Sequence, residues 1–211
     1  MKAPIGFEGR SVQLPGHICL FYKSEDELRR RQAAFLRFAV DGKREGIVLM
    51  GGTGIAETLY RYLEVDLGVD LSTRRDAGMI ALAHGDVDVD EQLENVIRPI
   101  EAMIEGGAKL VRLVGRVQWG GPDYAASEDV VWYESKLNDR IAGLPVVLVC
   151  AYDIFELPGE ALILGGLHSH PQLLCGTFSD RNTLVESTKR HLQLRMAEFP
   201  WLTEVDSSGG G

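Results

Sequence analysis

Short apolar runs alternate with longer amphipathic stretches along most of the chain. The runs are continuous rather than alternating in polarity, which is typical of strands covered on both faces, as in a parallel sheet. We therefore predict strands at 17–22, 46–51, 79–83, 110–117, 146–152 and 173–178. The intervening stretches are long enough for helices, so the pattern predicts a three-layer α/β domain with a mostly parallel sheet.

The intervening stretches also carry helix signals. Ser24 and Glu27 form a capping box at the start of the first predicted helix, and Phe35 and Phe38 share one of its faces. Three further helices are predicted at 90–105, 127–141 and 180–199. Pro99 lies inside the first of these three, and we expect it to kink or split that helix.

The 211 residues contain no internal repeat and no linker that would divide them. We expect one domain over 17–200, preceded by an irregular lead-in at 1–16 and followed by a flexible tail at 201–211.

Composition narrows the classes of partner. The chain has 22 basic and 31 acidic residues, a net charge of −9, and such a surface repels phosphate backbones. No apolar run approaches the ~20 residues needed to cross a bilayer, and no signal pattern opens the chain. We expect a cytoplasmic protein without direct nucleic-acid or membrane contact. Cys19, Cys150 and Cys175 lie in apolar runs and are predicted to be buried free thiols.

Chemistry-bearing side chains follow several predicted strands. In an open parallel sheet, ligands gather at the carboxyl ends of the strands, where this chain places Tyr22, Arg116, Trp119, Tyr152 and Asp153. These residues could line a small-molecule pocket. The alternative is that they are the polar residues found at the edge of any such sheet.

A glycine-rich turn at 51–54 follows one predicted strand and precedes a helix, where backbone amides could hold a phosphate. The chain has no GxxxxGK[ST] string, and Glu57 stands where a dinucleotide fingerprint needs its third glycine. We favour a plain tight turn.

Histidines offer two further candidates. His168 and His170 could bind a metal from one face of an extended segment, but no third ligand is evident nearby, and Pro171 favours a turn with solvated imidazoles. We also interpret the acidic stretch at 86–91 as solvated, and so expect no metal site. His17 opens the first predicted strand; it either serves the pocket or is held by backbone hydrogen bonds.

Glu134 falls on the apolar face of the 127–141 helix, one turn before Asn138. A buried carboxylate needs a partner, because burying it unpaired is expensive. We expect Arg116 to be that partner.

Several strings together resemble a known family. They are His17-Ile18-Cys19-Leu20-Phe21-Tyr22, the segment 115–119, Tyr133-Glu134 with Asn138, Cys150-Ala151-Tyr152-Asp153, and His170-Pro171. Their order and spacing resemble the MEDS domain (methanogen/methylotroph, DcmR sensory domain) over roughly residues 15 to 185. The resemblance implies a core similar to the RecA/KaiC-type P-loop fold without the phosphate-binding lysine.

The resemblance also implies a sensor of small molecules, hydrocarbon or one-carbon derivatives among them, that signals to regulatory modules. It makes Tyr22, Trp119, Tyr152 and Asp153 preferred pocket residues and strengthens the case for His17 and His170. The family usually has an acidic residue after Gly115, where this chain has Arg116, and this reversal favours an anionic ligand.

We therefore expect a stand-alone sensory or regulatory protein rather than an enzyme, signalling through a protein partner, and the sequence specifies no cofactor. One alternative is a nucleotide-binding protein or NTPase-like enzyme that uses the glycine turn in a non-standard way. Another is an interaction module whose sheet edge or 180–199 helix forms a homo-oligomer surface.

Overall fold

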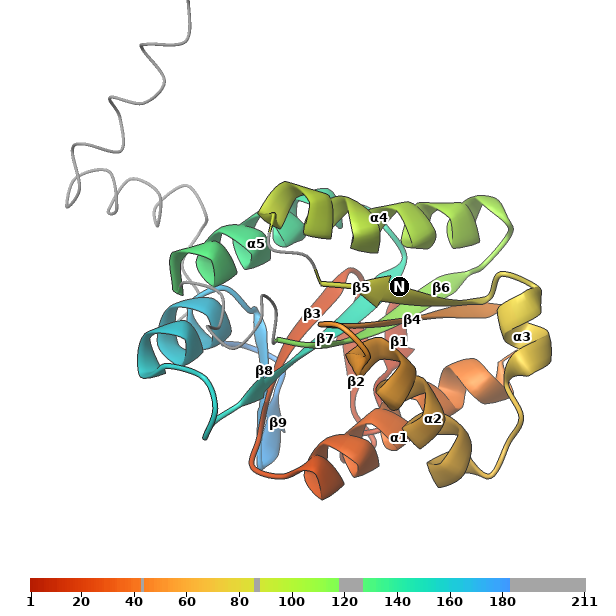
Figure 1. Cartoon of the computed structure of the whole chain (residues 1–211), viewed down its shortest axis with the longest axis horizontal. Helices are drawn as coiled ribbons and strands as arrows, with labels where there is room; N and C mark the ends of the chain where they lie inside the picture. The colour runs from red at the N-terminus through yellow and green to blue at the C-terminus, as the bar shows by residue number, and fades with distance from the viewer. Residues whose placement is uncertain (43, 86–87, 118–126, 183–211) are drawn as a thin grey trace, which may run out of the picture.

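A seven-stranded sheet forms the centre of the molecule (Figure 1). The computed structural model describes residues 1–42, 44–85, 88–117 and 127–182. In sheet order the strands are β5 (Ile80–His84), β4 (Glu45–Gly51), β6 (Leu110–Arg116), β7 (Val146–Asp153), β3 (Gly16–Tyr22), β8 (Gln172–Cys175) and β9 (Thr177–Ser179). All neighbouring pairs are parallel except β8–β9. The predicted mostly parallel α/β fold is confirmed.

Helices cover both faces of this sheet. In Figure 1, α1 (Glu25–Asp41) and α2 (Ile55–Leu67) lie below it, and α4 (Val89–Glu105) and α5 (Ser127–Arg140) lie above it. The short α3 (Ser72–Asp76) leads into β5, and the π-helical segment η1 (Ala161–Leu167) packs beside α5. Among the described helices, none combines the length and apolar character needed to cross a bilayer.

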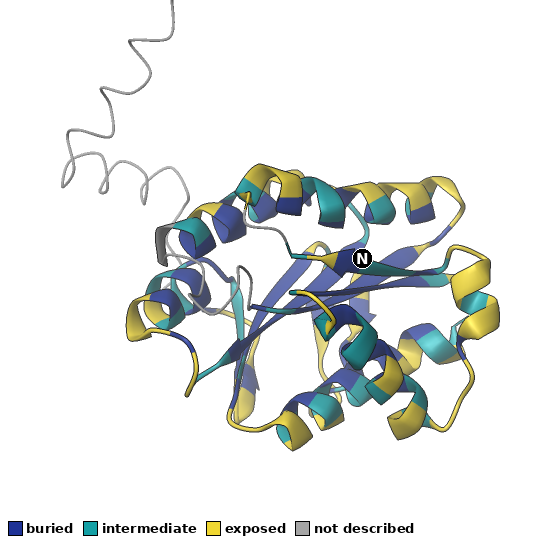
Figure 2. Ribbon diagram, in the orientation of Figure 1, coloured by how far each residue is buried: buried dark blue, intermediate teal, exposed yellow. Residues whose placement is uncertain are grey.

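The double coverage explains why the strands read as continuous apolar runs. Figure 2 shows the central strands buried along their length. Successive side chains of β3 enter opposite cores. Ile18 and Leu20 pack in the core between the sheet and helices α1 and α2, whereas Cys19 packs in the core between the sheet and helices α4 and α5.

The N-terminal segment differs from the prediction. Residues 1–16, expected to be irregular, contain the antiparallel strands β1 (Lys2–Pro4) and β2 (Ser11–Gln13), with Ile5 and Phe7 buried beside them. The expected strand at 173–178 is also two strands, because Gly176 takes a left-handed φ of +73° and turns the chain back on itself.

The helix starts follow capping chemistry. The backbone amide of Glu27 donates to Ser24 Oγ at 3.3 Å, as the capping box predicts. The second predicted helix begins after Asp88, whose carboxylate accepts from the amide of Glu91 at 2.8 Å. It continues through Pro99 and is not split, because its apolar stripe is buried against the sheet on both sides of the proline. The predicted 180–199 helix and the 201–211 tail lie outside the described residues, apart from 180–182.

Candidate functional site

Two of the predicted pocket residues meet at the carboxyl edge of the sheet. The Arg116 guanidinium lies over the Tyr22 ring, 5.8 Å from its centre. Arg116 Nη1 is 2.6 Å from Glu25 Oε1, and Nη2 is 3.7 Å from Glu156 Oε2. The cation is therefore neutralised by carboxylates from α1 and from the loop after β7.

The other candidates at this edge differ in their surroundings. Asp153, the last residue of β7, accepts from the amide of Phe155 at 2.9 Å and so holds the turn that follows. Tyr22 is fully buried, and within the described residues its hydroxyl has no hydrogen-bond partner. Burial raises the pKa of the Tyr22 phenol, an effect that the nearby Arg116 opposes only in part. Trp119 lies outside the described residues.

The remaining four candidates gather deeper in the molecule, between the sheet and α5. Tyr152 donates from its hydroxyl to Glu134 Oε1 at 2.6 Å. The other oxygen, Oε2, lies 3.2 Å from His17 Nε2 and 3.5 Å from His170 Nε2. All four residues are buried. We call these residues, together with Cys150, the buried polar cluster.

The alternation of side chains along the strands places this cluster. Cys19 of β3 is paired in register with Cys150 of β7, so His17, Cys150 and Tyr152 all project toward α5. Glu134 meets them from the apolar face of α5, as the helical spacing predicts. The predicted pairing of Glu134 with Arg116 is wrong, because Arg116 ends β6 on the side of α1 and binds Glu25.

Sequence reasoning did not assign two of the residues here to a site: Cys150, a member of the cluster, and Asn138, which contacts it. Cys150 Sγ lies 3.3 Å from His17 Nε2 and 3.6 Å from Glu134 Oε2. Asn138 Oδ1 is 2.9 Å from His17 Nδ1, and Asn138 Nδ2 donates to the carbonyl of Ser169 at 2.7 Å. His17 is thus held by a side chain rather than by the backbone. Of the three cysteines, Cys19 and Cys150 are buried as predicted, whereas Cys175 is exposed.

His170 is the clearest correction at the site. The sequence favoured a solvated imidazole, but the ring is completely buried, with its centre 4.1 Å from that of His17 and 5.7 Å from that of Tyr152. The segment that follows η1 turns His170 inward, where Nδ1 lies 3.0 Å from the carbonyls of both Gly165 and Gly166.

Burial controls protonation in the cluster. It lowers the pKa of His170 to about 3, assisted by the adjacent His17 and against the attraction of Glu134. Burial, with the nearby Glu134 carboxylate, raises the pKa of the Cys150 thiol. At neutral pH, His170 is therefore an uncharged imidazole and Cys150 is a thiol.

The glycine turn between β4 and α2 is explained by packing. A Cβ on Gly51 would lie 2.3 Å from Ile55 Cγ2, and Gly54 takes a φ of +76°. Glu57 in the first turn of α2 lies 3.5 Å from His84. These contacts account for both glycines without a bound phosphate.

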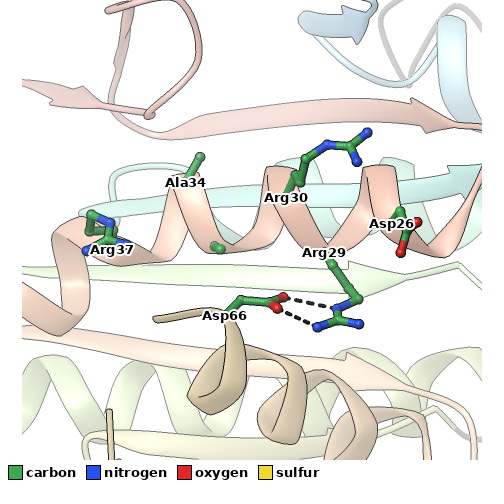
Figure 3. A pocket seen from close by; sticks show the side chains of 7 residues that line it. Asp26, Arg29, Arg30, Ala34, Arg37 and Asp66 are labelled. Atoms are coloured by element: carbon green, nitrogen blue, oxygen red, sulfur yellow. Dashed lines mark hydrogen bonds and ion pairs between the residues drawn. The ribbon is translucent and has the colours of Figure 1, made fainter. Parts of the chain in front are cut away.

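Surface hollows lie away from this turn. One, of about 200 Å³, opens at the carboxyl ends of β3 and β8. Its lining residues are Phe21, Lys23, Glu27, Ile154, Cys175 and Gly176. Another, of about 540 Å³, lies on the outer surface of α1 and α2, where Arg29 binds Asp66 (Figure 3).

Comparison with models of protein families shows to which family the chain belongs. The model of the MEDS family, "MEthanogen/methylotroph, DcmR Sensory domain", matches residues 16–171. The chain belongs to the MEDS family. The MEDS match begins one residue before His17 and ends one residue after His170, so it spans the whole buried polar cluster.

Solved structures share the MEDS fold of this chain. The KaiC-like protein PH0186 from the hyperthermophilic archaeon Pyrococcus horikoshii OT3 is similar, with a TM-score of 0.58 and 15% sequence identity. The similarity covers 82% of this chain and 80% of that one. A search of curated proteins found no match. The expected likeness to a KaiC-type core is confirmed for the fold.

Proposed function

We propose that this MEDS-family protein is a sensor that binds a small, uncharged organic molecule and transmits the binding event to a regulatory protein partner. Membership of a family of sensory domains supports the general role. The specific ligand site rests on the hollow at the carboxyl ends of β3 and β8, where an open parallel sheet places its ligands.

One chain of contacts carries this proposal. Phe21 lines the hollow, and its ring centre lies 5.9 Å from that of Tyr152. Tyr152 in turn donates to Glu134 in the buried polar cluster. A molecule seated against Phe21 is thus separated by this one side chain from Tyr152, a member of the buried polar cluster, whose arrangement depends on close packing.

The chemistry of the hollow favours a small neutral ligand. Phe21, Ile154 and Cys175 offer apolar walls, and Lys23 and Glu27 add polar groups of opposite charge. A volume of about 200 Å³ lies below the roughly 300–1,000 Å³ typical of drug-sized sites. Arg116 no longer supports the expectation of an anionic ligand, because Glu25 and Glu156 already balance its positive charge.

The loop after β7 connects the ligand hollow to the protein surface, where a partner could detect ligand binding. Ile154 lines the hollow, and the next residue, Phe155, is 76% exposed. A ligand that displaces Ile154 would also reposition this exposed aromatic ring. Aromatic side chains are common anchors in protein interfaces, so we propose that the partner contacts Phe155.

Thermal unfolding in the presence of short-chain alcohols, haloalkanes and nitriles tests the ligand site. We expect at least one of these probes to raise the Tm of the wild type, because a ligand that binds only the folded state stabilises it. Cys175→Phe fills the hollow and should abolish the shift, whereas Val65→Phe, at an exposed position of α2, should retain it. A Tm unmoved by every probe, or an equal shift in both variants, would count against the site.

The nucleotide-binding alternative receives less support. The likeness to a KaiC-like protein at 15% identity concerns the fold, and the β4–α2 turn presents Glu57 without a lysine. Binding of ATP or GTP at millimolar concentration, measured by calorimetry, would revive this alternative.

A further inference from the structure

We propose that His17, Glu134, Cys150 and His170 form a closed tetrahedral site for a divalent metal ion of the zinc class. One ligand atom from each residue lies within 4.8 Å of all the others, and all four side chains are buried. They come from β3, α5, β7 and the segment after η1, so a bound ion would tie α5 and that segment to the sheet. Metal binding at this site does not depend on the proposed sensing of a small molecule.

The distances between the ligand atoms fit such a site. Typical zinc bond lengths place tetrahedral ligands about 3.3 Å apart for nitrogen and oxygen, and about 3.5 Å apart where sulfur is one of the pair. Here Glu134 Oε2 lies 3.2 Å from His17 Nε2 and 3.5 Å from His170 Nε2. Cys150 Sγ lies 3.3 Å from His17 Nε2 and 3.6 Å from Glu134 Oε2. These four separations are close to four of the six edges of a zinc tetrahedron, and the other two edges, from His170 to His17 and to Cys150, lie within 4.8 Å.

Both histidines are held in the tautomer that a metal requires. His17 Nδ1 faces Asn138 Oδ1, and the Asn138 amide is oriented by its own bond to the Ser169 carbonyl. His170 Nδ1 faces two backbone carbonyls. These oxygens accept hydrogen bonds only, so each Nδ1 carries the proton and each Nε2 directs a lone pair into the cluster. Metal-bound histidines are oriented by the same outer contacts.

His170 supplies an independent sign of a missing ligand. Its Nε2 is completely buried, and within the described residues it has no hydrogen-bond partner. Buried polar atoms are nearly always satisfied, and an exception calls for a specific explanation, such as an ion. A metal ion at the centre of the cluster would accept this lone pair.

One carboxylate oxygen of Glu134, Oε1, already has a hydrogen-bond donor. Tyr152 donates to Oε1, which leaves Oε2 as the atom directed at the centre of the cluster. A hydrogen bond of this kind fixes a carboxylate as a monodentate ligand and is the usual outer contact of a metal-bound carboxylate.

The donor set identifies the class of ion. Two imidazoles, one sulfur and one carboxylate match the ligands of zinc, whereas magnesium and calcium prefer oxygen alone. On binding, the Cys150 S–H bond is replaced by a sulfur–metal bond, and the proton leaves to solvent. A thiolate, a carboxylate and two neutral imidazoles then carry a charge of −2, which the divalent ion cancels within the core.

Cobalt(II), which takes the same tetrahedral ligands as zinc, supplies the readout. The purified full-length chain is stripped with a chelator, loaded with Co²⁺ and desalted. We expect one cobalt per chain, tetrahedral ligand-field bands in the visible, and a thiolate-to-cobalt charge-transfer band in the near ultraviolet. Added Zn²⁺ should bleach these bands, and Mg²⁺ should not. A chain that retains no cobalt, or a spectrum without the charge-transfer band, would overturn the proposal.

Matched cysteine variants locate the sulfur ligand. Cys150→Ala should lose the charge-transfer band. Cys19→Ala should keep it, although Cys19 is equally buried and is the register partner of Cys150. The opposite pattern would exclude the proposed site. If Cys150→Ala does not fold, the isosteric Glu134→Gln decides: we expect its cobalt affinity to fall by about tenfold or more, and an unchanged affinity would overturn the proposal. Because no organic probe is present, this outcome is separate from that of the small-molecule test.

Discussion

Tyr152 donates a hydrogen bond to Oε1 of Glu134 at 2.6 Å, between β7 and α5 in the interior of the molecule. Removing the hydroxyl leaves a buried carboxylate oxygen without its donor, and such bonds to charged groups contribute about 1.5–3 kcal/mol. We expect Tyr152→Phe to lower the free energy of unfolding in urea by this amount. Tyr62→Phe, at a half-buried position of α2, should change the free energy of unfolding by less than about 0.5 kcal/mol. Equal effects in the two variants would show that the Tyr152–Glu134 bond contributes little.

Asn138 should control metal affinity without binding the metal. It holds the ring of His17 through Nδ1, and loss of such an outer contact typically reduces metal affinity by about 10–100-fold. We therefore expect Asn138→Ala to weaken cobalt binding by that factor while retaining the thiolate charge-transfer band. Asp139→Ala, the exposed neighbour on α5, should bind as the wild type does. An unchanged cobalt affinity in Asn138→Ala would contradict the proposal that the Asn138 amide orients His17 for metal binding.

The glycines of η1 are required by close packing against the cluster. A Cβ on Gly165 would lie 2.5 Å from Val130 Cγ1 and 3.3 Å from the Tyr152 hydroxyl. Overpacking of this kind costs about 1–3 kcal/mol, so we expect Gly165→Ala to destabilise the fold by that amount in chemical denaturation. Gly159→Ala, whose Cβ would meet no atom within 4 Å, is the control and should be nearly neutral. Wild-type stability in Gly165→Ala would contradict the packing described here.

The three thiols should differ in reactivity. Burial raises the pKa of Cys19 and Cys150, and the thiolate is the form that reacts with alkylating agents. Cys175 is exposed. We expect the native chain to show one fast-reacting thiol with a disulfide reagent, which Cys175→Ser should remove, and three thiols after denaturation. Rapid labelling of Cys150 in the native state, located by peptide mass spectrometry, would contradict its burial.

The fold was predictable from the sequence because its signals are local. Continuous apolar runs located β3 to β7 to within one or two residues, and parallel pairing then brought Tyr22 and Arg116 to one edge. The N-terminal hairpin was missed because its strands have three residues each, too few to show a period. Arg112 is buried in the middle of β6 and pairs with Glu45, a half-buried residue at the start of β4, so an apolar run can contain a charge when a partner is supplied from another strand.

The buried polar cluster was only partly predictable, because its members lie on four separate elements. The helical spacing placed Glu134 on the buried face, yet nothing in the sequence around it indicated that histidines from β3 and from beyond η1 would meet it there. Pro171 correctly indicated a turn, but it gave no direction to the His170 side chain, which the segment after η1 turns inward. Such convergence depends on tertiary packing rather than on local pattern.

X-ray absorption at the zinc edge of the zinc-loaded protein tests the buried polar cluster as a metal centre most directly. We expect a four-coordinate ion with one sulfur at about 2.3 Å and three nitrogen or oxygen ligands at about 2.0–2.2 Å. A first shell without sulfur, or a six-coordinate shell of oxygen and nitrogen, would contradict it.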